Sequence, residues 1–145
     1  MNTMIKRGTI LTLAMLMFVV SMLVPIKRAD AAMMYNNTNN ASLSASINSN
    51  GKLSASLYVM GMKGKTTKIE TSLYVEKKIL GLFWSRVDIG YTDNIWHDST
   101  SNYYYSHTFS HDLTSTGTYR VTVTYTVSGS GGANDVITIT DTTSN

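Results

Sequence analysis

The stretch from Thr118 to Val127, TYRVTVTYTV, alternates strictly between apolar or aromatic side chains and polar ones. Because successive side chains of a strand point to opposite faces, this period of two predicts a β-strand with one buried face. β-Branched and aromatic residues, which are frequent in strands, fill nearly every position. This segment is the clearest strand of the chain, and the rest of the fold is inferred outward from it.

Two serine-rich segments, Leu43–Ile47 and Leu53–Val59, alternate in the same way on either side of a polar turn. A two-residue loop would place Ile47 opposite a serine, whereas a three-residue loop of residues 49–51 aligns the apolar positions of both segments. We therefore predict a three-residue hairpin loop with Gly51 in the left-handed conformation.

Further strands are expected along the chain, which brings the total to about seven, and no segment after residue 31 has a helical period. Seven short strands in about 100 residues predict an all-β fold, a single antiparallel β-sandwich. The additional expected strands are Thr67–Lys77, Phe83–Tyr91 with Phe83, Val87 and Ile89 facing inward, Tyr103–Phe109 and Val136–Thr140.

The N-terminus has the pattern of a secretion signal. Lys6 and Arg7 precede an apolar run over residues 10–24, and the small-x-small sequence Ala29-Asp30-Ala31 follows it. We predict that residues 1–31 are removed on export and that the mature protein is extracellular. The alternative is an uncleaved N-terminal segment that anchors the protein to the membrane, since residues 8–26 approach the length of a span.

The net charge and the absence of cysteine exclude several classes of function and of site. The signal segment accounts for the formal net charge of +3, because eight bases and eight acids remain after it. A neutral chain does not suit nucleic-acid binding. The absence of cysteine excludes disulfides and thiolate metal sites. We expect a flexible leader over residues 32–40 and one sandwich domain over residues 41–145.

The segment Leu113–Val123, LTSTGTYRVTV, contains the pattern Gly-x-Tyr-x-Val-x-Val. It resembles the entry to the sixth strand of fibronectin type III and other bacterial immunoglobulin-like domains. In those domains the tyrosine hydroxyl bonds a backbone group a few residues upstream and forms a corner, a role that the resemblance assigns to Tyr119. The whole chain is similar to small exported proteins of Gram-positive bacteria with no assigned activity, which implies adhesion or recognition rather than catalysis.

Catalytic and metal chemistry find little support in the residues. His107 and His111 would share one face of a strand about 13 Å apart at about 3.3 Å per residue, too far for one ion. No Gly-x-Ser-x-Gly elbow marks a nucleophilic serine. We therefore expect no metal, no cofactor and no catalytic residue. The alternative enzyme is a small secreted hydrolase that uses histidine and aspartate of the segment 96–112.

Two surface features could bind a glycan. The outward threonines of the segments 122–126 and 138–140 predict a flat face of hydroxyl groups, although threonine is also common on exposed strands. Tyr58, Tyr74 and the run Tyr103–Tyr105 could stack on sugar rings.

The segment Glu76–Arg86, EKKILGLFWSR, departs from the family pattern, because sandwich hairpin tips usually carry polar turn residues. If the tip is exposed, its apolar residues and neighbouring bases suit a membrane interface or a hydrophobic groove. Alternatively, the loop folds back and caps the sandwich with Trp84 as a plug. The candidate contact residues are Lys77, Lys78, Ile79, Leu80, Leu82, Phe83 and Trp84.

The sequence thus favours a secreted, non-enzymatic binding module that contacts a protein, a glycan or a membrane surface. Besides the hydrolase, a bacteriocin-like or toxin-like protein that acts on membranes is an alternative, because the same apolar tip would serve it.

Overall fold

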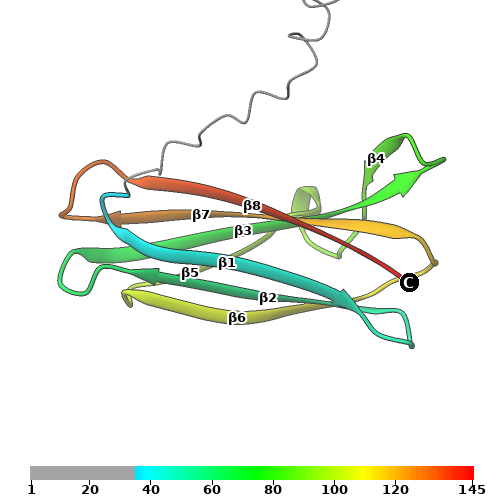
Figure 1. Cartoon of the computed structure of the whole chain (residues 1–145), viewed down its shortest axis with the longest axis horizontal. Helices are drawn as coiled ribbons and strands as arrows, with labels where there is room; N and C mark the ends of the chain where they lie inside the picture. Colours follow the sequence, from blue (N-terminus) through cyan, green and yellow to red (C-terminus); the bar gives the residue numbers. More distant parts are fainter. Residues whose placement is uncertain (1–34) are drawn as a thin grey trace, which may run out of the picture. The chain divides into compact units, whose positions relative to one another are not determined.

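The computed structural model describes residues 35–145, so the expected signal peptide and the start of the leader lie outside the described residues. Eight strands and one short 3-10 turn, Thr92–Asn94, make up this part of the chain (Figure 1). It contains no helix that could cross a membrane. The strands are β1 (Thr38–Ile47), β2 (Lys52–Gly61), β3 (Thr66–Ile79), β4 (Phe83–Arg86), β5 (Trp96–Thr100), β6 (Tyr104–Asp112), β7 (Thr118–Gly129) and β8 (Asp135–Ser144).

The strands form two antiparallel sheets packed face to face. One sheet has the order β1-β2-β6, and the other has β4-β3-β7-β8 with β5 also paired to β3. Immunoglobulin domains have the first, second and fifth strands in one sheet and the third, sixth and seventh in the other. This chain has the same arrangement when β4 and β5, which both pair with β3, are counted together as the fourth strand. The predicted all-β sandwich of immunoglobulin-like type is therefore confirmed.

The predicted register of the first hairpin is confirmed. Ile47 pairs with Leu53 across a three-residue loop, so the alternating apolar residues of β1 and β2 face the same side. Gly51 has a φ of 76°, which a glycine adopts without the steric penalty of a Cβ. Sequence parity alone was sufficient here because a shift of one residue would expose the whole apolar face.

The core lies between the inward faces of β2, β3 and β7, where alternate side chains are almost completely inaccessible to solvent. The largest of these fully buried side chains belong to Leu53, Leu57, Val59, Ile69, Leu73, Val75, Tyr119, Val121, Val123, Tyr125 and Val127. All of them except Val75 pair with a neighbouring strand on both sides. Burial of this set is the main source of stability, because the chain has no disulfide.

The tyrosine corner predicted at Tyr119 is present. Its ring is buried, and its hydroxyl donates a hydrogen bond of 2.6 Å to the carbonyl oxygen of Ser115, four residues upstream. Tyr119 is the second residue of β7, so this bond fixes the end of the β6–β7 connection at the point where the chain enters β7.

The expected fourth strand, Phe83–Tyr91, is wrong in extent. β4 ends at Arg86, and a turn follows in which the Asp88 carboxylate accepts a hydrogen bond from the amide of Gly90, whose φ is 81°. The chain then pairs with the same edge of β3 again through β5, a strand that the sequence did not predict. Of the three side chains expected to face inward, Ile89 is buried and Val87 is half-buried, but Phe83 is 63% exposed.

At the end of the sandwich away from the turn between β3 and β4, a buried carboxylate holds the start of the described chain to β8. Asp135 accepts hydrogen bonds from the amides of Asn36 and Asn37, both at 2.8 Å, and from the Thr38 hydroxyl at 2.9 Å. The Asn37 side chain in turn bonds the backbone of the β7–β8 loop. Residues 36–38 are therefore bonded to the sandwich, and β1 begins at Thr38.

Replacement of Tyr119 by phenylalanine tests the corner. We expect Tyr119→Phe to lower the free energy of unfolding by about 1 kcal/mol, because it removes one hydrogen bond and keeps the buried ring. Urea denaturation at neutral pH measures the change. Tyr91→Phe, at an exposed tyrosine in the turn before β5, is the control and should fall within about 0.5 kcal/mol of the wild type. Equal effects of the two substitutions would contradict a stabilising corner.

The hydrogen bonds to Asp135 make the free energy of unfolding depend on pH in the acidic range. Burial alone would raise the pKa of this carboxyl group, but its hydrogen bonds from Asn36, Asn37 and Thr38 outweigh burial and lower it. A lowered folded-state pKa gives stabilisation that is complete above the unfolded value, about 3.9, and is lost as the pH falls through the folded value.

We expect Asp135→Asn to cost about 2 kcal/mol at pH 7, because a neutral amide offers one acceptor oxygen and no charge. The difference from the wild type should shrink below about pH 4, where the carboxyl group of the wild type is also neutralised. Urea denaturation at pH 7 and pH 3 measures both values. A difference that does not change with pH would contradict the network.

Candidate functional site

The candidate site is the β3–β4 hairpin, which extends beyond the sandwich because β3 is longer than its neighbour β7. The pairing of β3 with β7 ends at Lys77 and Tyr119, whereas β3 continues to Ile79. Past Lys77, the last two residues of β3 pair only with Trp84 and Phe83 of β4. The last part of the hairpin thus has two strands and no opposing sheet, and it projects from one end of the domain (Figure 1).

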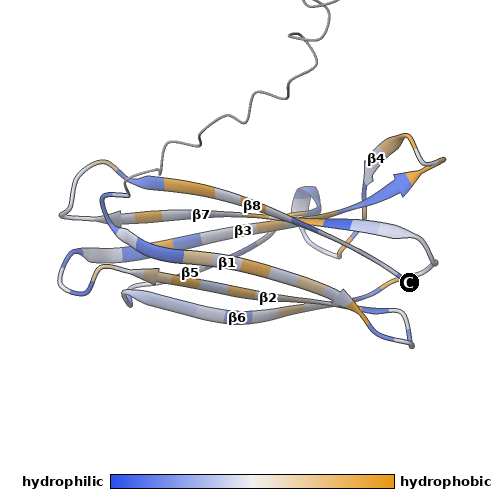
Figure 2. Ribbon diagram, in the orientation of Figure 1, coloured by the Kyte–Doolittle hydropathy of each residue, from blue (hydrophilic) through white to orange (hydrophobic). Residues whose placement is uncertain are grey.

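The tip of this hairpin, residues 79–83, is apolar and exposed (Figure 2). The exposed fraction is 39% for Ile79, 86% for Leu80, 73% for Leu82 and 63% for Phe83. Soluble domains rarely leave several adjacent large apolar side chains in water without a contact that covers them. The tip is therefore the clearest candidate contact surface in the described part of the chain.

The turn at the tip is strained by its sequence. The amide of Leu82 donates a hydrogen bond of 3.0 Å to the carbonyl oxygen of Ile79, and the two residues between them, Leu80 and Gly81, have φ values of 52° and 70°. Tight hairpin turns of this kind favour asparagine, aspartate or glycine at such positions. A leucine with positive φ is uncommon and unfavourable. The most exposed apolar side chain thus occupies a position where a polar residue would stabilise the turn better.

Cation–aromatic contacts hold the base of the hairpin on the outer face of its sheet. The guanidinium of Arg120 lies 4.3 Å from the ring centre of Trp84, and the amine of Lys78 lies 5.6 Å from it. Arg120 also bonds the carboxylate of Glu76 through two nitrogens, at 2.6 and 2.9 Å. These contacts stiffen a short two-stranded segment that would be marginal by itself.

The inner face of the hairpin borders an open cleft of about 420 Å³. Its other wall is the β6–β7 connection, and the amine of Lys77 spans the two walls with a hydrogen bond of 2.7 Å to the Ser115 hydroxyl. The tip therefore does not fold back over the sandwich. Trp84, expected as a core plug in the capping arrangement, instead lies half-buried on the outer face.

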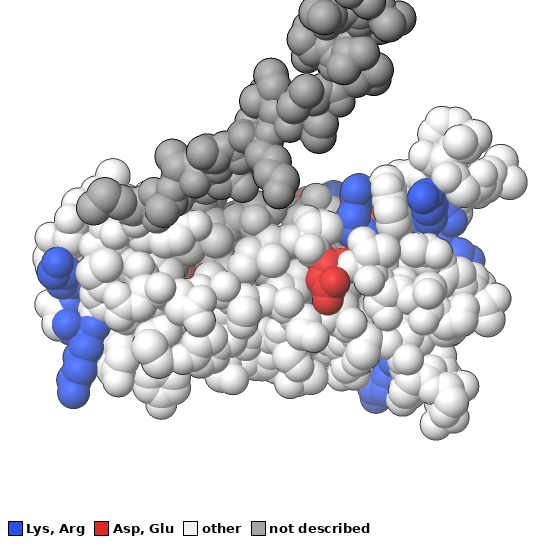
Figure 3. Space-filling view, viewed as in Figure 1, with Lys and Arg blue, Asp and Glu red and all other residues white. Residues whose placement is uncertain are grey.

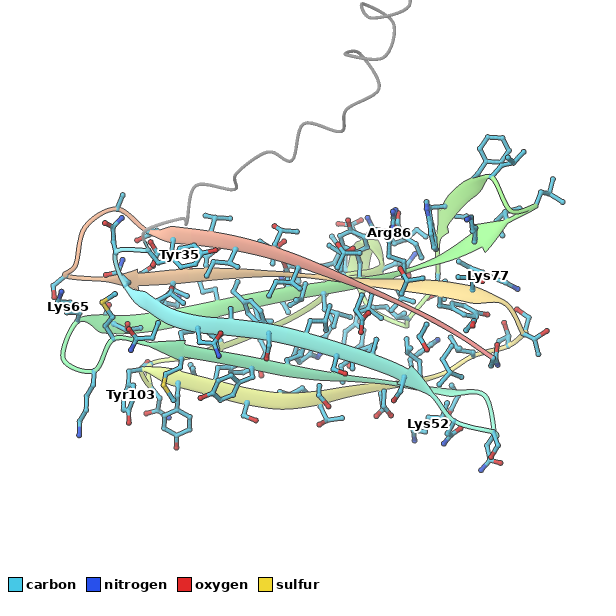
Figure 4. All side chains as sticks on the ribbon, in the orientation of Figure 1. Tyr35, Lys52, Lys65, Lys77, Arg86 and Tyr103 are labelled. Atoms are coloured by element: carbon cyan, nitrogen blue, oxygen red, sulfur yellow. The ribbon has the colours of Figure 1, made fainter. Side chains whose placement is uncertain are left out.

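Basic side chains surround the base of the hairpin while its tip is uncharged (Figure 3). Lys77 and Arg86 lie at this base, as Figure 4 shows, and the Arg86 guanidinium stacks on the ring of Tyr74 at 3.6 Å. We refer to Lys77, Lys78 and Arg86 as the basic collar. None of the three forms an ion pair with another residue of the range 35–145.

The three histidines do not assemble a catalytic or metal site among the described residues. His97 is exposed on β5, His107 stacks on the Trp96 ring with centroids 4.9 Å apart, and His111 is half-buried. Within residues 35–145, no histidine side chain has a hydrogen bond to a serine or an aspartate, and no group of three potential ligands could hold a metal ion. Asp98 instead accepts a hydrogen bond of 2.8 Å from the Tyr105 hydroxyl.

Comparison with known proteins adds little. The chain matches no family model and no curated protein sequence. Among solved structures it is similar to the CARDB domain of the PF1109 protein from Pyrococcus furiosus, which was solved in complex with di-metal ions. The identity is 15%, the TM-score is 0.42, and the match covers 76% of this chain and 96% of that one. A similarity at this level carries no information about activity.

The contacts at the hairpin base lead to a prediction about its rigidity. We expect Trp84→Ala to raise the rate of chymotryptic cleavage at residues 80–83 about tenfold, because loss of two cation–π contacts of about 0.5–1 kcal/mol each favours opening of the hairpin. The free energy of global unfolding should fall by no more than these two contacts contribute, about 1–2 kcal/mol, since the core lacks Trp84. Tyr91→Ala serves as control. Unchanged cleavage would show that Trp84 does not hold the base.

Proposed function

We propose that this protein is a non-catalytic contact module that acts outside the cell and attaches reversibly to lipid membranes by inserting its hairpin tip. The observation that carries the proposal is the exposure of four apolar side chains at a projecting turn with three bases behind it. Action outside the cell follows from the signal pattern of residues 1–31. We include in this proposal the resemblance of the chain to small exported proteins of Gram-positive bacteria.

The spacing of apolar and basic residues suits a bilayer interface. Lys77 precedes Leu80 by three residues, which corresponds to about 10 Å along a strand. The headgroup layer on each side of a bilayer is about 5–8 Å thick. If Leu80 and Leu82 enter the outermost hydrocarbon, the basic collar lies at the level of the lipid phosphates. Trp84 would lie there too, at the depth that tryptophan prefers.

The energetics suit reversible attachment. Each large apolar side chain that leaves water contributes about 1.5–3 kcal/mol, and the tip side chains are only partly exposed to begin with. Each base near an anionic surface adds about 1 kcal/mol. The contacts of Trp84 order the hairpin in advance, which lowers the entropy lost on binding. The sum is several kcal/mol, enough for attachment and too little for permanent insertion.

Flotation with vesicles of phosphatidylcholine and phosphatidylglycerol tests the proposal. We expect Leu80→Asp to reduce the bound fraction at least about tenfold, because a carboxylate replaces the most exposed apolar side chain at the bilayer. Val136→Asp is the matched control, since Val136 is an apolar residue of β8 that is 61% exposed at a distance from the tip. It should bind like the wild type.

Equal binding of Leu80→Asp and the wild type would overturn the proposal, as would failure of the wild type to bind. Dye-filled vesicles distinguish attachment from a toxin-like role. Attachment predicts binding without leakage, and rapid leakage at the bound concentration would favour the bacteriocin-like alternative.

A further inference from the structure

A second surface of different chemistry covers the outer face of the sheet β1-β2-β6. The register aligns its outward side chains in rows across the three strands, and none of them is charged between the two ends of the face. The rows are Asn40–Met60–Tyr104, Ser42–Tyr58–Ser106, Ser44–Ser56–Thr108 and Ser46–Ser54–Ser110. We call this surface the hydroxyl face.

An aromatic platform occupies one end of the hydroxyl face. Tyr104 is 51% exposed and Met60 beside it is 37% exposed, while Tyr58 is half-buried on the neighbouring row. The ring of Tyr103 packs edge-on against that of Tyr104, with centroids 5.5 Å apart and an angle of 75°. Tyrosines held in this way offer rigid rings with polar ends at a low entropic cost.

The structure separates these tyrosines from the others that the sequence offered for sugar stacking. Tyr74 lies on the opposite face of the domain, where Arg86 covers its ring at 3.6 Å. Tyr105 is buried and bonded to Asp98. Only Tyr58, Tyr103 and Tyr104 of that set remain together at one surface.

The threonine hydroxyls expected to form a flat face on the other sheet are less available for hydrogen bonds to a ligand. The hydroxyl groups of Thr122 and Thr140 lie 3.2 Å apart and those of Thr124 and Thr138 lie 3.0 Å apart, so each pair shares a hydrogen bond. Thr122 is also buried. On the hydroxyl face, by contrast, the serines of β1 and the hydroxyl residues of β6 are exposed.

We infer that the hydroxyl face binds an extended, uncharged polysaccharide, with one or more sugar rings stacked on Tyr104. A neutral chain matches a face without charges, because neither partner must lose the hydration of an ion. Serine and threonine hydroxyls donate and accept hydrogen bonds, as sugar hydroxyls do. Three strands about 4.8 Å apart give a floor about 10 Å wide, and seven residues extend it over about 20 Å. A linear chain of several sugars fits this shape.

Binding to insoluble cellulose and chitin, measured by depletion of the soluble protein, tests the inference. We expect binding that persists in 1 M NaCl, since no ion pair contributes. Tyr104→Ala should weaken it about tenfold through loss of the stacking ring. Ser56→Asp, which places a charge in the middle of the face, should weaken it by a similar factor.

Two matched controls locate the effect. Tyr91→Ala removes a tyrosine of similar exposure elsewhere, and Thr142→Asp adds the same charge to the other sheet; both should bind like the wild type. Thermal unfolding of each variant checks that it is folded. The inference fails if the wild type binds neither polysaccharide, or if Tyr104→Ala and Ser56→Asp bind as the wild type does. Leu80→Asp should bind polysaccharide normally, so this inference and the proposed membrane contact can fail separately.

Discussion

The pairing of β3 with β7 is the contact on which the rest of the structure depends. The two strands run antiparallel through the middle of their sheet, and their inward residues form most of the core from that side. β7 also carries Tyr119, whose corner bond fixes the connection from the other sheet. Where β7 begins, β3 loses its neighbour, and the chain beyond Lys77 leaves the sandwich. The paired part of the two strands therefore carries the core, and the difference in their lengths produces the projecting hairpin.

The two ends of the domain illustrate how such a chain is stabilised without disulfides. At one end, the carboxylate of Asp135 gathers three donors from residues 36–38, and Asn37 ties the same segment to the β7–β8 loop. The Asp135 carboxylate and the Asn37 side chain are thus bonded within the domain. At the other end, the hairpin and the β6–β7 connection are joined across an open cleft by the bond from Lys77 to Ser115. Because that end is left open, the tip is free to contact something else.

Local pattern was sufficient to predict the elements that have one buried face. The parity of apolar residues around Gly51 gave the hairpin register, and the Gly-x-Tyr pattern located the corner at Tyr119. Pattern was insufficient at the edge of β3, where β4 and β5 share one partner. The expected strand Phe83–Tyr91 ends at Arg86 because its pairing with β3 ends there, and the local turn from Asp88 to Gly90 follows before the chain pairs with β3 again as β5. Nor could alternation decide whether the tip was capped, since that depends on where β7 begins.

The geometry of the turn bears on why the tip is apolar. Leu80 has a φ of 52°, a conformation in which asparagine or glycine would be more stable, and its side chain is 86% exposed, so packing within the domain does not compensate. Strained residues persist when the surroundings or a function require them. Here the surroundings do not, because neither β7 nor the β6–β7 connection covers the tip. A leucine that weakens its own turn and gains nothing from the core is explained if its burial takes place in a complex, where the transfer of its side chain out of water offsets the strain.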